Sequence, residues 1–125
     1  MGKRYLIDSN TLIHFQAKTL PEKGQVFVGE IADTEFNISV INKIEVLGYA
    51  DVTKSTEDFI SLANVFDLDA DIIKTTISLR KKHKIKIPDA IIAATSLAYN
   101  FTLVTGNTAD FKSIKGLLLI NPEKL

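Results

Sequence analysis

Four acidic side chains occur in this 125-residue chain where carboxylates could act together. Asp8 and Asp110 each follow a short apolar run typical of a buried strand, whereas Glu45 and Asp89 lie in stretches with helical periodicity. If the two strands are neighbours, both aspartates lie at the edge of a parallel sheet where ligands bind. Carboxylates gathered there repel each other unless a cation holds them, and an all-oxygen set without cysteine suits Mg²⁺ or Mn²⁺. Such a site activates water and neutralises charge on a phosphodiester during hydrolysis.

Three of these acids also have a purely structural explanation. Asp8 could cap the helix that follows it, and Asp110 could belong to an ordinary polar turn. An acid in the first turn of a helix, such as Asp89, is stabilised by the helix dipole by roughly 0.3–1 kcal/mol. The helix behind Asp89 is apolar almost all round, however, so its first turn should be partly buried, and a buried carboxylate needs a counter-charge. A metal ion would supply that charge.

Glu45 is more informative because of its place on its own helix. It falls four residues after Ile41 and four before Tyr49, on the flank of the apolar stripe, while Asn42 and Lys43 are expected to face the other way. A solvated glutamate would sit with those two polar residues. We therefore take all four acids as catalytic and metal-binding candidates, with Asp8 as the expected bridging ligand.

Other polar residues could support this site. Thr105, Asn107 and Asn10 are expected to orient the acids through hydrogen bonds. A basic run precedes Asp89 in the chain and consists of Arg80, Lys81, Lys82, Lys84 and Lys86. It is either the solvated end of a helix, where the dipole favours cations, or a contact for a nucleic-acid backbone. The sequence leaves both interpretations open.

The elements that must position these residues alternate along the chain. Strands are expected over 5–7, 36–40, 101–105 and 117–120, with a short one at 65–68. Helices are expected after Ser9, from Ser39 through residue 49, from Ser55 or Thr56, from Asp69 and from Pro88. Residues 20–33 are hard to interpret because two glycines weaken a possible helix. Strands separated by helices predict a three-layer α/β/α sandwich around a parallel sheet of four to five strands, with the first strand central.

Composition limits the classes of protein that fit. The length suits one domain over residues 1–125, and the absence of cysteine removes disulfides, thiolate zinc sites and cysteine catalysis. Fifteen basic residues balance fifteen acidic ones, so a nucleic acid would have to be held by a local basic patch. No signal-peptide core or membrane-spanning stretch is evident, and we expect a cytoplasmic protein with no membrane contact.

Several of these segments resemble those of a known family. They read YLIDSN at the start, INKIEVLGY in the middle, and KIPDAIIAATSLAYNFTLVTGNTADF followed by LLLINP near the end. In their order and spacing they are similar to PIN-domain ribonucleases, and within that group to the VapC-type toxins of toxin–antitoxin pairs. The resemblance runs nearly end to end. Ser9 stands where threonine is commoner in that family, and Gly106 where many members carry a basic residue.

The resemblance implies a fold, an activity and partners. Asp8, Glu45, Asp89 and Asp110 match the family's acidic quartet, with Thr105 and Asn107 as supporting polar residues. The implied activity is Mg²⁺- or Mn²⁺-dependent endoribonuclease cleavage of RNA. A homodimer and a small antitoxin that blocks the site are implied as well.

Three other classes of function compete with this hypothesis. A phosphoacceptor signalling domain would need a second acid beside Asp8 and a lysine within 105–107, and a phosphatase using Asp-x-Asp would need an acid where Asn10 stands. A PIN fold that binds RNA or protein without cutting is the more serious alternative. The complete quartet argues against it, because a pure binder of phosphates has no reason to gather four acids.

Overall fold

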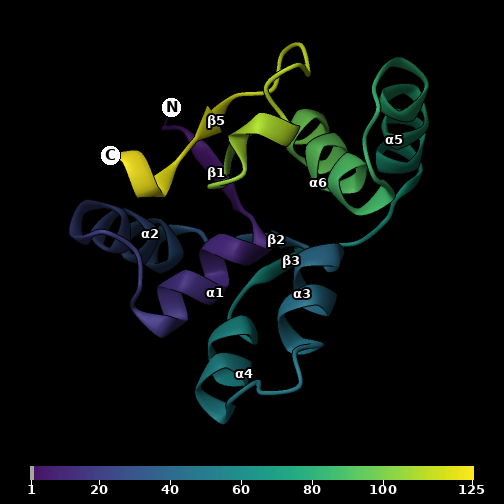
Figure 1. Cartoon of the computed structure of the whole chain (residues 1–125). Coiled ribbons are helices and arrows are strands. Elements are labelled where there is room, and N and C mark those ends of the chain that lie inside the picture. Colours follow the sequence, from purple (N-terminus) through teal and green to yellow (C-terminus); the bar gives the residue numbers. More distant parts are fainter. Residues whose placement is uncertain (1) are drawn as a thin grey trace.

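Five parallel strands and the helices between them form the molecule. In the computed structural model, which describes residues 2–125, the order is β1 (Arg4–Ile7), α1 (Ser9–Ala17), α2 (Glu22–Thr34), β2 (Asn37–Ser39), α3 (Val40–Leu47), α4 (Lys54–Ile60), β3 (Asn64–Phe66), α5 (Ala70–Lys82), α6 (Ile87–Ala98), β4 (Phe101–Val104), η1 (Thr108–Asp110), β5 (Leu119–Ile120) and η2 (Pro122–Lys124). The predicted α/β sandwich is confirmed. Figure 1 shows α5 and α6 on one side of β1 and α1 and α2 on the other.

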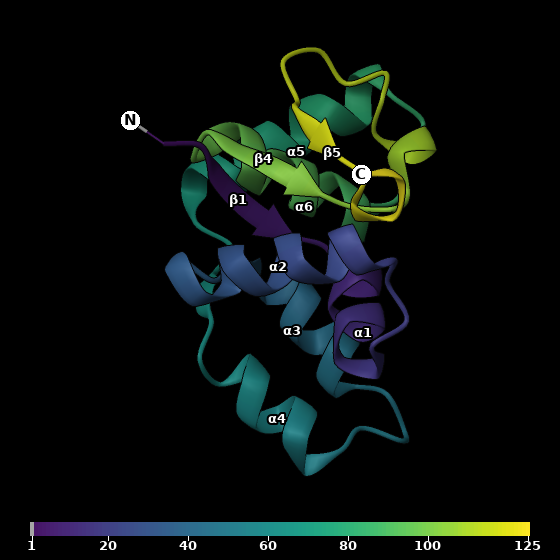
Figure 2. The same cartoon turned by 90° about the vertical axis from the view of Figure 1, so that its left-hand side faces the viewer.

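The strands are hydrogen-bonded as two parallel sheets, one in the order β1-β4-β5 and one that pairs β2 with β3. In the first sheet Leu6 pairs with Leu103, and Figure 2 shows its three strands side by side. β2 packs against the other edge of β1, and the side-chain amide of Asn37 donates to the Tyr5 carbonyl at 3.1 Å. A side-chain hydrogen bond therefore joins β2 to β1, where backbone hydrogen bonds would join neighbouring strands of one sheet. β1 lies between β2 and β4, as predicted.

Each face of the first sheet supports its own apolar core. Leu6 and Leu103 belong to a cluster under α5 and α6, while Ile7 and Val104 belong to one that includes residues of α1 to α4. Neighbouring strand residues point to opposite faces, and both faces here are covered by helices. This is why these strands are continuously apolar instead of alternating.

Most helix starts follow the predicted caps. Asp69 accepts from the Ile72 amide, Ser39 accepts from the Ile41 amide, and proline stands in the first turn of α6. α4 is capped by Thr53, two or three residues before the predicted cap at Ser55 or Thr56. α3 ends at Leu47, not at residue 49, and β3 and β5 are shorter than predicted.

The segment that was hard to interpret from the sequence is the thirteen-residue helix α2. Its two glycines lie at places where the helix meets other parts of the chain. A Cβ atom on Gly24 would lie 2.0 Å from the Pro122 carbonyl oxygen, so only glycine allows η2 to lie this close. A Cβ atom on Gly29 would meet the Phe15 ring at 3.6 Å, an ordinary contact. The low helix propensity of Gly24 is thus offset by tertiary packing.

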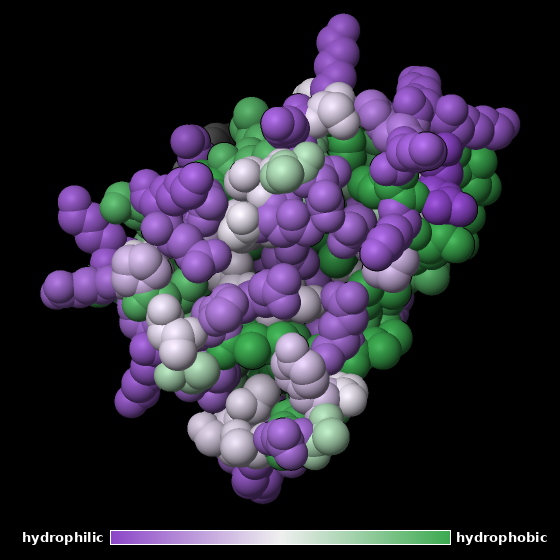
Figure 3. All heavy atoms as spheres, viewed as in Figure 1, coloured by the Kyte–Doolittle hydropathy of each residue, from purple (hydrophilic) through white to green (hydrophobic). Residues whose placement is uncertain are grey.

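The surface is mixed in character. Figure 3 shows a face on which hydrophilic residues predominate and apolar residues appear between them. Some large apolar side chains stay exposed, among them Ile73 and Ile77 one helical turn apart on α5. Within residues 2–125, no helix is both long and apolar enough to cross a membrane.

Candidate active site

An acidic pocket lies where β1 and β4 end. Its volume is about 300 Å³, and it is lined by Asp8, Ser9, Asn10, Ile13, Glu45, Tyr49, Asp89 and Asn107. Three of the four predicted acids therefore meet at one hollow although they come from segments far apart in the sequence. Asp8 follows β1 at the same level at which Thr105 follows β4, whereas Glu45 lies on α3 and Asp89 in the first turn of α6.

Asp8 is the buried centre of the site, with 7% of its surface exposed. Its Oδ1 accepts the Ser9 amide at 2.9 Å, and its Oδ2 accepts the Thr105 hydroxyl at 2.7 Å. Asp8 therefore caps α1, in line with its structural explanation, and also presents a carboxylate to the pocket. The Thr105 hydroxyl oxygen in turn accepts a hydrogen bond from the Asn107 backbone amide at 3.0 Å. Because the oxygen accepts there, the hydroxyl proton of Thr105 points toward Asp8.

Burial raises the pKa of the Asp8 carboxyl, and the charge of Glu45 raises it further. The hydrogen bonds from Thr105, Ser9 and Asn42 act in the opposite direction, since they favour the ionised form. An ionised carboxylate that is buried beside a second acid destabilises the folded protein. A bound cation would remove that destabilisation.

Asp89 lies at the start of α6 and is half-buried. Burial raises its pKa first, and the charges of Asp8, Asp110 and Glu45 raise it further, while Lys86 lowers it. Among the described residues, none donates a side-chain hydrogen bond to this carboxylate. Three other acids thus act on Asp89 through space, as expected if the quartet shares one region.

Asp110 lies beside the pocket and does not line it. It is exposed at the end of η1, where its Oδ2 accepts the Asn107 side-chain amide at 2.7 Å. Asn107 therefore links Asp110 to the Thr105–Asp8 pair through its own backbone amide. Asn10 is exposed at the pocket rim.

Two polar residues of the site were not singled out from the sequence. The expectation that Asn42 faces away from Glu45 was wrong, because Asn42 is fully buried and bonds both Ser9 and Asp8. Ser9 donates its hydroxyl proton to Glu45 Oε1 at 2.5 Å. The signal that could have found Asn42 is its spacing of three from Ser39, which forms a capping box and turns the amide toward the site.

The donor set fits a hard divalent cation in chemistry, since carboxylate and amide oxygens surround the pocket and cysteine is absent from the chain. The acidic side chains do not converge on a single point. Within residues 2–125 no three acidic or histidine side chains stand close enough to enclose an ion. Glu45 is held on Ser9 and Asp110 on Asn107. To bind one ion the acids would have to move closer together. Each of these hydrogen bonds would leave the second oxygen of its carboxylate, Glu45 Oε2 or Asp110 Oδ1, for that ion.

The basic run divides into two parts. Arg80 donates to the Ile85 carbonyl at 2.7 Å and thereby closes the turn between α5 and α6. Lys81, Lys82, Lys84 and Lys86 have exposed side chains, and Lys86 is close enough to Asp89 to lower its pKa. Arg80 thus has a structural contact that the predicted RNA-binding role did not include.

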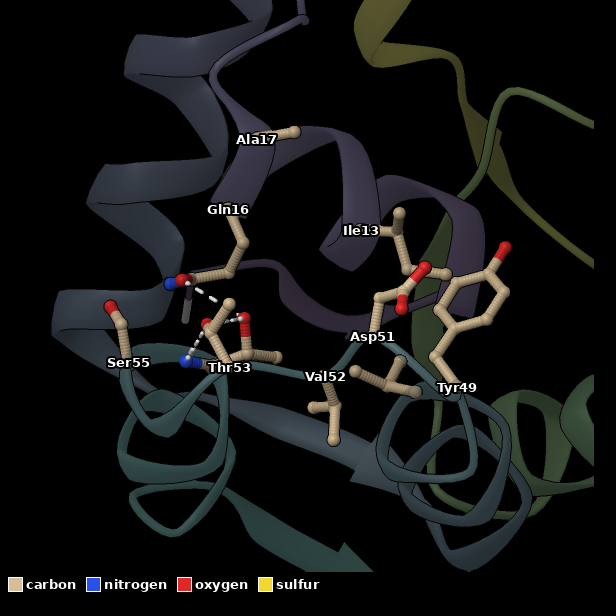
Figure 4. Close-up of a pocket in the computed structure, with 10 residues that line it drawn as sticks. Ile13, Gln16, Ala17, Tyr49, Asp51, Val52, Thr53 and Ser55 are labelled. Atoms are coloured by element: carbon tan, nitrogen blue, oxygen red, sulfur yellow. Dashed lines mark hydrogen bonds between the residues drawn. The ribbon is translucent and has the colours of Figure 1, made fainter.

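A second, apolar pocket adjoins the acidic one. It measures about 470 Å³, lies between α1 and the segment after α3, and shares Ile13 and Tyr49 with the acidic pocket. Figure 4 shows Asp51 between Ile13 and Tyr49, with Gln16 near Thr53 on the far side. Of the residues that line this pocket, only Asp51 carries a full charge. No motif in the sequence indicated this pocket.

Asp89→Asn should stabilise the metal-free protein by roughly 0.5–1 kcal/mol, after allowance for solvent screening. The folded pKa of Asp89 is raised above its ordinary value of 3.8, so wild-type stability falls as pH rises through the window above 3.8. Asparagine has no such loss. The melting temperatures of the two proteins should therefore differ at pH 7 in EDTA and converge below pH 3.8.

If Asp89 is one of the metal ligands, added Mg²⁺ should stabilise the wild type more than Asp89→Asn, because the variant would lack that ligand. A helix-start acid with no part in the site would behave differently. Its loss would lower the melting temperature in EDTA by the dipole contribution, roughly 0.3–1 kcal/mol, and leave the gain from Mg²⁺ unchanged. That pattern would contradict the placement of Asp89 in the site.

The fold and the pocket define an α/β protein with carboxylates gathered where its parallel strands end. The sequence profile of the PIN domain matches residues 5–117. The chain belongs to the PIN-domain family. None of the curated protein sequences matches the chain.

Solved structures of similar fold are toxin–antitoxin assemblies. A toxin–antitoxin complex from Klebsiella pneumoniae is 30% identical, with 97% of this chain and 99% of that chain covered and a TM-score of 0.79. VapBC2 from Rickettsia felis bound to a promoter DNA fragment is 28% identical, with 94% and 97% covered and a TM-score of 0.77. VapBC-1 from nontypeable Haemophilus influenzae, at 22% identity with 96% and 98% covered and a TM-score of 0.76, shares the fold. The first two of these neighbours, together with the family match, confirm the resemblance to the VapC-type group.

Proposed function

We propose that this protein is a metal-dependent endoribonuclease and the toxin of a toxin–antitoxin pair. The observation that carries the proposal is the acidic pocket, in which Asp8, Glu45 and Asp89 line one hollow and Asp110 lies beside it. Family membership supports a nuclease, and the Klebsiella pneumoniae neighbour at 30% identity supports a toxin. RNA as substrate and Mg²⁺ or Mn²⁺ as cofactor are parts of the proposal.

Each residue of the site would have a definite task. Asp8, Glu45, Asp89 and Asp110 would hold Mg²⁺, which when bound supplies an activated water and neutralises charge on the phosphodiester. Thr105 keeps Asp8 oriented through the hydrogen bond to Oδ2. Asn107 holds Asp110 near the pocket and, through its amide, fixes the direction of the Thr105 hydroxyl. Asp8 is buried and still lines the pocket.

A panel of RNAs tests the proposal against its main alternative, a PIN fold that only binds RNA or protein. The purified protein should cut at least one of transfer, ribosomal or messenger RNA at internal positions in Mg²⁺, and leave DNA of the same sequence intact. Retention of an RNA in a binding assay with no cleavage in Mg²⁺ or Mn²⁺ would favour the binding module. The acids argue against that outcome, since they repel phosphates unless a cation is present.

We also propose that a small antitoxin binds beside the acidic pocket. The similar structures are toxin–antitoxin complexes. The apolar pocket adjoins the acidic pocket and shares Ile13 and Tyr49 with it. A partner segment carrying an apolar residue next to a basic one would meet both. A homodimer is proposed by resemblance, and a cytoplasmic location is proposed from the expectation drawn from the sequence. Cleavage that persists undiminished in a stable complex with the antitoxin would contradict a blocking role.

Lys82, Lys84 and Lys86 are proposed to contact the RNA backbone. Replacing all three with glutamine should weaken RNA binding and flatten its salt dependence, by about 0.7 in the log–log slope for each phosphate that is no longer neutralised on a single strand. The measurement is the RNA dissociation constant against salt concentration. Lys43, an exposed residue of α3, gives a control substitution to glutamine. An unchanged slope in the triple variant would make the run the solvated end of α5.

A further inference from the structure

Three hydrogen bonds connect the end of β2 to Glu45. The Ser39 amide donates to Asn42 Oδ1 at 2.8 Å, Asn42 Nδ2 donates to Ser9 Oγ at 2.9 Å, and the Ser9 hydroxyl donates to Glu45 Oε1 at 2.5 Å. The three residues before Glu45 in this series are all buried, and they belong to β2, α3 and α1. Glu45 itself is exposed.

The direction of every bond in this series is fixed by its first member. A backbone amide can only donate, so the Asn42 atom that faces Ser39 must be the carbonyl oxygen. The amide nitrogen of Asn42 then faces Ser9 and must donate. Because the Ser9 oxygen accepts this bond, the one proton of its hydroxyl is left for Glu45.

Glu45 depends on this proton for its orientation. Within residues 2–125, the Ser9 hydroxyl is the one hydrogen-bond donor that contacts the Glu45 carboxylate. A long exposed side chain without such a bond is free to sample several rotamers. Asn42 also reaches Asp8 Oδ1, at 3.4 Å, so one amide group contacts both sides of the acidic pocket.

We propose that Asn42 is a positioning residue that holds Glu45 at the acidic pocket through the Ser9 hydroxyl. Asn42 does not contact the proposed ion or RNA. It acts by setting which way the Ser9 proton points. The inference rests on the proposed function in that it assigns Glu45 a place among the metal-binding acids.

Ser9→Ala tests the proposal because it removes the hydroxyl and leaves the Ser39–Asn42 cap in place. Ser9→Thr is the matched control, since it keeps a hydroxyl at the same position. NMR side-chain couplings of Glu45, assigned with Glu45→Gln, should show one rotamer in the wild type and in Ser9→Thr and averaged values in Ser9→Ala. Affinity for Mn²⁺, measured on metal-free protein by electron paramagnetic resonance, should fall about tenfold in Ser9→Ala alone.

Asn42→Asp gives a second test of the direction of the bonds. Aspartate at this position can still accept the Ser39 amide but can no longer donate to Ser9. The Ser9 hydroxyl should then turn to residue 42, and the Glu45 couplings should average as in Ser9→Ala. A folded Asn42→Asp protein with wild-type Glu45 couplings would overturn the role of Asn42. Should this variant fail to fold, an unchanged Ser9→Ala protein would still overturn the proposal.

A folded Ser9→Ala protein with unchanged Glu45 couplings, or with unchanged Mn²⁺ affinity, would overturn the proposal. A lower melting temperature with both quantities unchanged would do the same, and Asn42 would then only cap α3. Neither measurement uses RNA. A protein that cuts no RNA would therefore refute the proposed function without deciding this inference.

Discussion

Asp8→Asn is expected to reduce RNA cleavage by at least about a hundredfold while the protein stays folded, since a catalytic metal ion is worth several kcal/mol of transition-state stabilisation. Asp8 is the acid at the centre of the pocket, between the Ser9 amide and the Thr105 hydroxyl. Asparagine keeps an oxygen for the Ser9 amide and is as good a helix cap as aspartate. It lacks the charge that a cation requires.

The measurement is the cleavage rate of the best RNA of the panel, beside circular dichroism and thermal melting of each protein. Asp33→Asn is a suitable control, because Asp33 is an exposed acid near the end of α2. It should cut as fast as the wild type. A folded Asp8→Asn protein that cuts at the wild-type rate would remove Asp8 from the catalytic site.

Gly24→Ala is expected to destabilise the fold by roughly 2–3 kcal/mol, which lowers the melting temperature by about 6–15 °C. The added Cβ would lie 2.0 Å from the Pro122 oxygen and 2.9 Å from its carbonyl carbon, and both are backbone atoms. η2 would have to move away from α2. On helix propensity alone the same change would stabilise the protein by about 1 kcal/mol. A Gly24→Ala protein that is less stable than the wild type would therefore show that η2 lies against Gly24.

Gly29→Ala is the matched control on the same helix. Its Cβ would meet the Phe15 ring at an ordinary 3.6 Å, so alanine should stabilise the protein by up to about 1 kcal/mol. Chemical denaturation of both variants gives the comparison. Two variants of equal stability, both above the wild type, would show that η2 does not lie against Gly24.

The architecture could be predicted because local patterns and tertiary structure agree over most of the chain. The apolar run before Asp8 and the Asp69 and Pro88 helix starts all occur as expected. α2 could not be predicted, since the reason for Gly24 is a contact with Pro122 near the other end of the chain. No local pattern reports such a contact.

The split between the two sheets was also beyond prediction. In the sequence, Asn37 is a polar residue in a short strand. Only the folded chain shows that its side-chain amide in β2 donates to the Tyr5 carbonyl in β1. Asn64 donates to the Asn37 side-chain oxygen at 3.1 Å, so a pair of asparagines sits where apolar strand residues would be expected.

Asp8 and Asp110 could be located from the ends of strands, and Glu45 and Asp89 from helical patterns, but the orientation of these acids could not be predicted. Asp8 and Asp89 line the pocket because strand ends and helix starts meet there. Asn42 was misplaced because apolar periodicity marks the buried stripe and gives no signal for a buried amide. Its hydrogen bonds to Ser9 and Asp8 cross between α3 and α1, and such pairings appear only in the fold.

Metal dependence decides most directly whether the acidic pocket is a nuclease site. The rate of RNA cleavage is measured on protein freed of metal with EDTA, and again as Mg²⁺ or Mn²⁺ is added back in excess. We expect no cleavage in EDTA and a rate that rises and saturates with either ion. Full cleavage in EDTA would contradict a metal-dependent site at these acids.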